Sequence, residues 1–268
     1  MVDVPASLVE HARAFLADPG KAVEPRHAAT VVLLRDGAEG PEVYLLRRAG
    51  TMAFAAGMHV FPGGSVDPRD GEVETSWAGP SPAGWGERLG CDETLARALV
   101  CAAVRETFEE SGVLLAGPSP DEVVAATTSD DWERDRLALL DRSASMAQML
   151  GARALVLRSD LMRPWAHWIT PEFEPRRFDT RFFVAAVPQG QLPRDVSSEA
   201  DRAAWVPVRR SLAEHDAGRM AMLPPTVQAL RDLASLVDVD AVLSEPREVR
   251  PVMPRLVEVD GSLRLEVT

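Results

Sequence analysis

The sequence has 268 residues, of which 46% are hydrophobic, so the chain can bury a large core as one elaborated domain or as a domain with a helical subdomain. Its formal net charge of −12 argues against non-specific binding to nucleic acid or to an anionic membrane, because a polyanion would repel it. The apolar runs are too short to span a membrane, and charged residues interrupt the N-terminal 17 residues, unlike a signal peptide. Two cysteines are too few for a disulfide framework, which indicates a reducing, cytoplasmic location.

The first part of the chain predicts a short helix followed by a β-hairpin. Residues 7–16 have helical composition, whereas 27–35 and 42–47 are strand-like runs separated by a turn. Arg47 and Arg48 close the second run. They are either solvated charges at a strand end or phosphate contacts. A small anionic substrate would need such a local patch of positive charge in this acidic chain.

Residues 95–110 predict a helix that carries an acidic edge. The stretch has no proline or glycine, and Gly112 is placed to end the helix. Val100, Cys101, Val104 and Phe108 gather on one side, which we expect to face the core.

Glu106, Glu109 and Glu110 stand at i, i+3 and i+4 on the opposite side of this helix, within an arc of about 100°. Carboxylates one turn apart repel one another, and a bound divalent cation would offset that repulsion. Mg²⁺ in particular is held by carboxylates together with substrate phosphates and water. A solvated acidic face remains the alternative, because the spacing alone does not decide between the two.

The segment Arg105-Glu106-Thr107-Phe108-Glu109-Glu110-Ser111-Gly112-Val113 resembles the second half of the nudix box, G-x5-E-x7-R-E-U-x-E-E-x-G-U, where U is apolar. Phe61-Pro62-Gly63-Gly64 is similar to the turn that opens this box, with Gly64 as its leading glycine. The resemblance implies a nudix fold, which is an α/β/α sandwich around a mixed sheet.

The box is split. Gly64 and Arg105 are 41 positions apart, which implies 27 inserted residues. The glutamate of the first half, counted back from the arginine, would fall on Arg97, so its role is assigned to no residue. Residues 66–90 have turn composition throughout, and we expect the insertion, about 66–92, to be an irregular excursion.

Residues 44–64 also resemble the signature of nudix coenzyme A diphosphatases, L-L-T-x-R-S-x3-R-x3-G-x3-F-P-G-G. Gly57 fills the glycine and Arg48 the first arginine of this pattern. Ala49 stands where the serine is expected and Ala53 where the second arginine is expected. The match is partial, since the lost arginine removes one candidate phosphate partner.

Beyond the box, helices are predicted over 121–126, 130–142 and 145–154. We expect this helical elaboration, about 120–160, to lie over one side of the site. Its methionines and tryptophan are typical of core packing.

Two further segments, Trp165–Pro171 and Pro175–Ala185, are similar to a nudix subgroup that includes the mammalian peroxisomal coenzyme A diphosphatase with a split box. Residues 182–187 within the second segment predict a buried strand. Arg176 and Arg177, together with Asp179, are either a structural ion-pair set or substrate contacts.

The last part of the chain contains one more candidate acid. Glu199 lies where nudix enzymes often place a loop glutamate near the metals, and an exposed loop acid is the alternative. A helix is predicted that starts within residues 223–226 and runs through 236, and 247–268 predicts a closing hairpin that could pair across a homodimer. We therefore divide the chain into a lead-in of residues 1–26, a nudix domain of residues 27–240 and an extension of residues 241–268.

The resemblance implies hydrolysis of a small-molecule nucleoside diphosphate derivative with Mg²⁺ or Mn²⁺ as cofactor. The metal would be held by the acidic edge and by the carbonyl of Gly64, while Arg105 would orient Glu106. The candidate site comprises catalytic Glu109, Arg105 and Glu199, substrate-binding Arg48, Arg176 and Arg177, and metal-binding Gly64, Glu106, Glu109 and Glu110.

Coenzyme A or an acyl derivative is the leading substrate hypothesis, with 3′,5′-ADP and a phosphopantetheine as products. NADH, a nucleotide sugar or a dinucleoside polyphosphate are the other enzymatic hypotheses. A nudix-derived module that senses a nucleotide without turnover is a hypothesis of another class. The complete set of Arg105, Glu106, Glu109 and Glu110 argues against it, because a sensor needs no full metal set.

Overall fold

The computed structural model describes residues 2–4, 8–18, 20, 22–50, 55–72, 75–194, 200–259 and 261–267. Its largest sheet contains β2 (Arg26–Gly37), β3 (Gly40–Arg48), β4 (His59–Val60), β5 (Gly63–Ser65), β9 (Met162–Ile169), β10 (Phe178–Ala186), β11 (Ala200–Pro207) and β12 (Pro251–Val252). The strand order is β11-β3-β2-β10-β9-β12, with β4 paired to β3 and β5 to β2. Because β10 runs parallel to β2 while β3 runs antiparallel to it, the sheet is mixed, as predicted.

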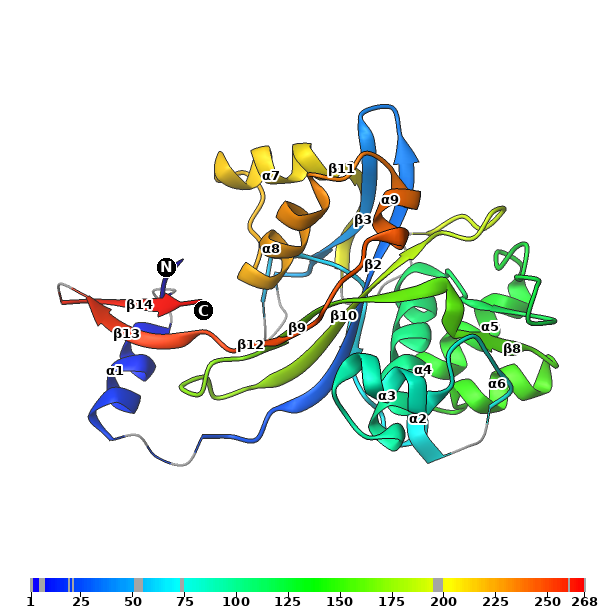
Figure 1. The fold of residues 1–268 in the computed structure, drawn as a ribbon, viewed down its shortest axis with the longest axis horizontal. Helices are drawn as coiled ribbons and strands as arrows, with labels where there is room; N and C mark the ends of the chain where they lie inside the picture. The colour runs from blue at the N-terminus through cyan, green and yellow to red at the C-terminus, as the bar shows by residue number, and fades with distance from the viewer. Residues whose placement is uncertain are drawn as a thin grey trace.

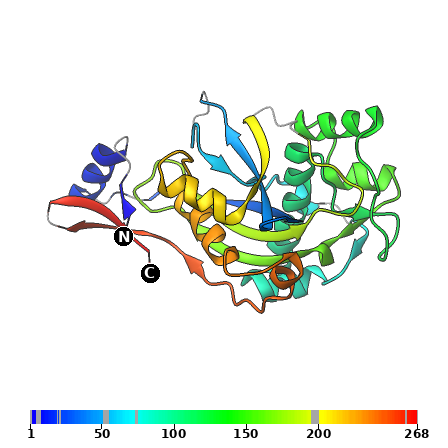
Figure 2. The ribbon, with the colours of Figure 1, turned by 90° about the horizontal axis from the view of Figure 1, so that it is seen from above.

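Helices cover both faces of this sheet (Figures 1 and 2). One face carries α2 (Arg69–Glu72), α3 (Pro82–Leu89) and α4 (Glu93–Ser111), and the other carries α7 (Val208–Asp216), α8 (Pro224–Leu233) and α9 (Val239–Ser244). The predicted α/β/α sandwich is therefore confirmed.

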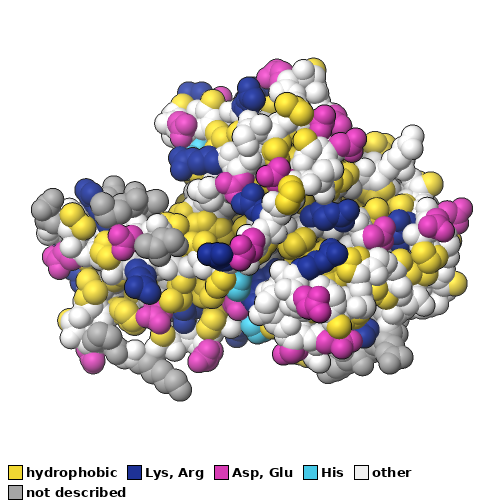
Figure 3. All heavy atoms as spheres, viewed as in Figure 1, with side chains coloured by type: hydrophobic (Ala, Val, Ile, Leu, Met, Phe, Trp, Pro, Cys, Tyr) yellow, Lys and Arg dark blue, Asp and Glu magenta, His cyan; other side chains and the backbone are white. Residues whose placement is uncertain are grey.

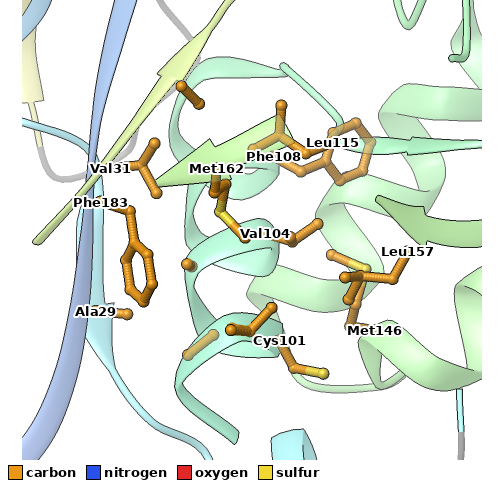
Figure 4. Close-up of a cluster of buried hydrophobic side chains, with 14 of the residues drawn as sticks. Ala29, Val31, Cys101, Val104, Phe108, Leu115, Met146, Leu157, Met162 and Phe183 are labelled. Atoms are coloured by element: carbon orange, nitrogen blue, oxygen red, sulfur yellow. The ribbon is translucent and has the colours of Figure 1, made fainter. Parts of the chain in front are cut away.

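The alternation of side chains along the strands builds a core on each side of the sheet. Val31 and Leu33 of β2 face α4, whereas Val32 and Leu34 face α8, as period-two alternation requires. The predicted apolar side of α4 is confirmed, since its residues are buried in one cluster, and Figure 4 shows Cys101, Val104 and Phe108 extending from the helix toward Met146 and Leu157.

Helix α4 begins and ends where its sequence provides caps. The Asp92 carboxylate accepts a hydrogen bond from the Leu95 N–H at 2.9 Å, which satisfies one free donor of the first turn. Gly112 follows the last turn with φ of +74°, a left-handed conformation that glycine adopts without strain. The predicted helix and its end near Gly112 are confirmed.

The prediction of an irregular excursion within residues 66–92 was wrong, because the segment contains α3. Its start is capped by Ser81, whose side chain accepts from the Gly84 N–H at 3.1 Å, and Pro82 occupies the first turn. Gly90 ends it with φ of +65°. These are ordinary helix signals, but the high content of proline and glycine hid them at the level of composition.

The segment after α4 pairs with a strand of the insertion to form a small sheet, and two helices pack beside it. The sheet pairs β6 (Trp77–Ala78), β8 (Val156–Arg158) and β7 (Ala116–Gly117), and the helices are α5 (Asp130–Leu140) and α6 (Met146–Ala152). Residues 121–126 are not helical, which corrects the prediction. Instead the Val124 N–H donates to the Ala116 carbonyl at 3.0 Å and continues the pairing of this sheet edge.

Both ends of the chain meet in a unit that lies at one side of the molecule (Figure 1). It consists of β1 (Val2–Asp3), α1 (Val9–Ala17), β13 (Arg255–Val259) and β14 (Ser262–Glu266), and β1 pairs with β14. The predicted closing hairpin is present as β13 and β14. Phe173, from the β9–β10 connection, is 1% exposed in the core of this unit.

No helix within the described ranges is long and apolar enough to cross a lipid bilayer. Basic and acidic side chains are interspersed over the face drawn in Figure 3.

Candidate active site

The turn before α4 needs two glycines because two other groups occupy the space of their side chains. Gly63 and Gly64 of β5 pair with Thr30 and Ala29 of β2. A Cβ atom at Gly63 would lie 2.6 Å from the Ala29 carbonyl oxygen, and one at Gly64 would lie 2.4 Å from Oε1 of Glu106. The absence of a side chain at Gly64 thus lets the Glu106 carboxylate approach the backbone of the turn.

Arg105 is the hub of the carboxylate cluster. Its Nη1 donates to Oε1 of Glu106 at 2.8 Å and to the two carboxylate oxygens of Glu109 at 3.2 and 3.3 Å. Its Nη2 also donates to the Ser65 carbonyl at 3.0 Å, which joins α4 to the glycine turn. The predicted contact between Arg105 and Glu106 is therefore present.

Asp70 is the fourth acid of this cluster, and sequence reasoning missed it. Oδ1 of Asp70 accepts from Arg105 Nε and Oδ2 accepts from Nη2, each at 3.0 Å. This bidentate geometry is the strongest form of a guanidinium–carboxylate pair. Asp70 is 5% exposed, so water competes little with the pair.

The signal for Asp70 is visible when the box is counted forward from Gly64 instead of backward from Arg105. Asp70 stands at the position of the first glutamate in G-x5-E, with aspartate in place of glutamate. The 27 extra residues consequently lie between Asp70 and Arg105, and the first half of the box is continuous. The expected start of the insertion at residue 66 is corrected to a point after residue 70.

The three glutamates of α4 reach the turn in different ways. Glu106 lies against Gly64, while Oε2 of Glu110 accepts from the Gly63 N–H at 2.9 Å. Glu109 is held by Arg105. Across the described part of the chain, no three histidine, cysteine, aspartate or glutamate side chains converge as a ready metal-ligand group. In this arrangement the mutual repulsion is offset by the guanidinium and by the backbone amide.

The cluster retains excess negative charge. Asp70, Glu106 and Glu109 all bond to the guanidinium of Arg105, whereas Glu110 bonds to the Gly63 N–H. Burial raises the pKa of Glu106 to about 7, although Arg105 acts in the opposite direction. Burial also raises the pKa of Glu109. Both shifts mean that the ionised carboxylates are incompletely compensated by the protein alone.

The residues at this position fit a divalent cation by their donor chemistry. Carboxylate oxygens and a backbone carbonyl are hard ligands of the type that Mg²⁺ and Mn²⁺ prefer. The added positive charge would favour the ionised form of Glu106 and Glu109.

The C-terminal end of α4 is fixed by the segments that follow it. Nη1 of Arg136 on α5 donates to the Glu109 carbonyl at 2.8 Å, and the Thr127 hydroxyl donates to the Gly112 carbonyl at 2.6 Å. The Arg194 N–H donates to the Ser111 carbonyl at 2.9 Å. These contacts satisfy carbonyls that a helix end otherwise leaves free. The helical elaboration therefore holds the turn that carries Glu109 and Glu110.

Arg48 lies at the end of β3, opposite Ala200 of β11. The Gly57 N–H donates to the Arg48 carbonyl at 3.0 Å, and Gly57 has φ of +70°. The two residues that match the coenzyme A diphosphatase signature are therefore brought together by a turn that favours glycine.

The arginines of the second candidate segment differ in environment. Arg177 is 6% exposed and donates to the carbonyls of Thr170 and Val23 at 3.0 and 2.7 Å, so its contacts are those of a structural residue. Arg176 is exposed. Asp179 forms ion pairs with His167 and Arg181, so the described residues do not show the predicted ion-pair set of Asp179 with Arg176 and Arg177.

Glu199, the candidate loop acid, lies outside the described residues. Its role stays a prediction.

A mixed sheet with an acidic helix packed against a glycine turn is the arrangement of nudix hydrolases, and comparison with known proteins agrees. The family model of the NUDT19 Nudix domain matches residues 87–233, more than half of the chain. The crystal structure of a NUDIX hydrolase from Alicyclobacillus acidocaldarius is 30% identical with a TM-score of 0.70, and the match covers 84% of this chain and 98% of that one. The chain belongs to the nudix hydrolase family.

Within the family the chain resembles NUDT19. It is 23% identical over 232 residues to the acyl-coenzyme A diphosphatase NUDT19 of Xenopus laevis, which covers 74% of this chain and 61% of that protein. It is also 27% identical over 236 residues to putative nudix hydrolase 7 of Caenorhabditis elegans, covering 88% of this chain and 70% of that protein. The chain thus spans less than two thirds of the length of the Xenopus diphosphatase.

Proposed function

We propose that this nudix hydrolase is a metal-dependent diphosphatase that cleaves coenzyme A or acyl-coenzyme A to 3′,5′-ADP and the corresponding phosphopantetheine. The observation that carries the proposal is the buried cluster of Asp70, Arg105 and the three α4 glutamates against the Gly63-Gly64 turn. The substrate class is supported by the partial signature around Arg48 and by the similarity to an acyl-coenzyme A diphosphatase.

Glu106, Glu109 and Glu110, with the carbonyl of Gly64, hold the cation in this proposal. Bound Mg²⁺ or Mn²⁺ supplies Lewis-acid activation of water and neutralises charge on the diphosphate. Arg105 keeps Glu106 and Glu109 oriented, and Asp70 fixes the guanidinium that does so.

In the reaction, the oxygen of water forms a bond to one phosphorus of the diphosphate while the bridging P–O bond breaks. The leaving phosphate carries away the electron pair of that bond. Glu109 is the preferred acceptor of the proton from water, and Arg105 holds its carboxylate in the cluster for that role. Arg48 contacts substrate phosphate.

The test is a substrate panel with Mg²⁺ or Mn²⁺, comprising coenzyme A, acetyl-coenzyme A, NADH, a nucleotide sugar and a dinucleoside polyphosphate, with products identified by mass. We expect coenzyme A or its acyl ester to have the highest kcat/KM. Replacement Glu109→Gln should lower kcat by about 10²- to 10⁴-fold. The matched control Glu93→Gln, at the exposed start of α4, should retain full activity.

Faster turnover of NADH or of a nucleotide sugar would contradict the substrate class but leave the chemistry in place. Full activity of Glu109→Gln would contradict the role of Glu109. Absence of hydrolysis across the panel with either metal would favour a nucleotide-sensing module.

A further inference from the structure

Three nitrogen-bearing side chains stand in one row across β11, β3 and β4. Arg202 of β11 is paired with Arg47 of β3, and Arg47 is paired with His59 of β4. Directly opposite residues of antiparallel strands project from the same face of a sheet. The row shares the face of Leu45, two residues before Arg47, which belongs to the core beneath α7 and α8.

Among the residues that the structure describes, the row has little acidic compensation. Like charges placed directly opposite one another on a sheet are destabilising. The carboxylate beside the row is Asp201, whose Oδ2 lies 3.8 Å from Nη1 of Arg47. Arg202 makes no ion pair or hydrogen bond with any residue that the structure describes. In a chain with a net charge of −12, two opposed guanidinium groups are a local exception.

Both arginines act on the pKa of His59. Burial lowers the pKa of His59, and Arg47 and Arg202 act in the same direction while Asp201 opposes them. Nδ1 of His59 lies 3.4 Å from the Ala221 carbonyl. The other ring nitrogen makes no hydrogen bond within the described ranges and can contact a ligand. The charges of Arg47 and Arg202 therefore act directly on the His59 ring.

This row is directly upstream of the glycine turn. His59 and Gly63 are separated by Val60, Phe61 and Pro62, and β4 passes into β5 through these residues. Phe61 is 3% exposed, and the Pro62 carbonyl accepts from the Val31 N–H at 2.8 Å. The link between the row and the glycine turn is thus short and fixed to the sheet, with the row on the α7–α8 face and α4 on the opposite face.

We propose that Arg47, Arg202 and His59 form a phosphate-binding subsite that takes a phosphomonoester dianion. Two guanidinium groups can donate several charge-assisted hydrogen bonds to one phosphate, and the dianion removes their mutual repulsion. The phosphate has two sources. It is either the 3′-phosphate of the substrate, which rests on the proposed function, or free inorganic phosphate.

The experiment measures binding by calorimetry to the whole chain in chelator, so that no hydrolysis occurs. The ligands are 3′,5′-ADP, 5′-ADP and inorganic phosphate, and the variants are Arg47→Ala and Arg202→Ala. Arg134→Ala is the matched control, because it removes the same charge from an exposed position on α5. Thermal unfolding of each variant confirms that the fold is retained.

We expect wild-type protein to bind 3′,5′-ADP about tenfold more tightly than 5′-ADP, and each row variant to lose that preference. This result assigns the row to the 3′-phosphate of the substrate. Equal binding of both nucleotides, together with inorganic phosphate binding that both variants lose, assigns the row to free phosphate. If Arg47→Ala and Arg202→Ala leave the affinity for all three ligands unchanged, the subsite is excluded.

The binding measurement with inorganic phosphate does not depend on the proposed function. A protein that fails to hydrolyse coenzyme A can still bind inorganic phosphate through the row, and an active diphosphatase can lack the subsite. The two failures are therefore distinguishable.

Discussion

Asp70 lies 35 residues before Arg105 and is nevertheless its bidentate partner. The first half of a split motif can keep its geometry only if the inserted chain returns to the same place. Here α2 and α4 are in contact, so Asp70 faces the helix that carries the second half. The insertion therefore leaves the relation between Asp70 and Arg105 intact.

We predict that Asp70→Asn lowers kcat by about 10- to 100-fold with little change in KM, because Arg105 then orients Glu106 and Glu109 less well. Steady-state kinetics with Mg²⁺ measure this directly. Asp67→Asn is the control on the same loop, since Asp67 bonds to Arg69 rather than to Arg105. An unchanged kcat for Asp70→Asn would contradict the orienting role.

The sequence predicted correctly those site features that depend on the spacing of residues along the chain. Glu106, Glu109 and Glu110 share a helix edge because of their i, i+3, i+4 positions, and Gly64 was found from the turn motif. Their hydrogen-bond partners could not be predicted, since Asp70 and the Gly63 amide come from chain segments whose approach depends on tertiary packing.

Among the elements, α5 has the closest relation to the catalytic helix. Arg136 is 4% exposed and bridges the Glu109 carbonyl and the Glu133 carboxylate. Glu133 also accepts from Nη2 of Arg194 at 3.1 Å. Helix α5, the end of α4 and the chain before residue 195 are joined by these contacts.

We predict that Arg136→Ala destabilises the fold by about 2–4 kcal/mol, because the Glu109 carbonyl loses its buried side-chain donor and Glu133 keeps only its bond from Arg194. Urea unfolding provides the measurement. Arg134→Ala, on the exposed side of the same helix, should cost no more than about 1 kcal/mol. An equal decrease in the free energy of unfolding for both variants would mean that the contact of Arg136 with α4 does not stabilise the fold.

A second element-level network links β9 and β10. Asp179 accepts from His167, whose Nε2 lies 2.5 Å away, and from Arg181. Burial alone would raise the pKa of Asp179, but these hydrogen bonds lower it to about 2. A carboxyl group whose pKa is depressed in the folded state adds stability above its ordinary value of 3.8, and that stability is lost as the pH falls through about 2.

Asp179→Asn should therefore lower the free energy of unfolding by about 2–4 kcal/mol at pH 7. The difference from wild type should become smaller as the pH falls from about 4 towards 2. Unfolding by urea across this pH range tests the sign. Asp121→Asn, at an exposed position, is the control and should show no such convergence. A deficit that is constant with pH would contradict the charge-based explanation.

The elements also show where sequence reasoning reaches its limit. Helix α4 was predictable because its apolar side, its acidic edge and Gly112 all indicate the same helix with the same end. Helix α3 was missed because proline and glycine dominate the composition around it, although Ser81 and Gly90 cap it. The supposed helix over residues 121–126 gave way to sheet pairing with Ala116, a long-range preference that propensity does not contain.

Across the whole molecule, the two chain ends form a unit built around Phe173 and separate from the carboxylate cluster (Figure 1). Its core contains Val4, Ala12 and Leu265, which come from β1, α1 and β14 or their borders. The pairing of β1 with β14 could not be read from the sequence, because the two strands are at opposite ends of the chain.

We predict that Phe173→Ala loosens this unit, with a local cost of about 3–5 kcal/mol for the lost aromatic side chain. Hydrogen exchange should accelerate in α1 and β14 while kcat and KM stay unchanged. Phe173→Leu should have a smaller effect in the same direction. A parallel loss of activity would show that the unit supports the active site.

We propose that the acidic edge of α4 and the Gly64 turn hold a divalent cation. Titration of Mn²⁺ followed by electron paramagnetic resonance measures this most directly, using wild-type protein, Glu106→Gln, Glu110→Gln and the exposed control Glu93→Gln. We predict that the two site variants bind Mn²⁺ at least about tenfold more weakly, while Glu93→Gln matches wild type. Wild-type protein that binds no Mn²⁺, or equal affinity in all four proteins, would contradict the claim.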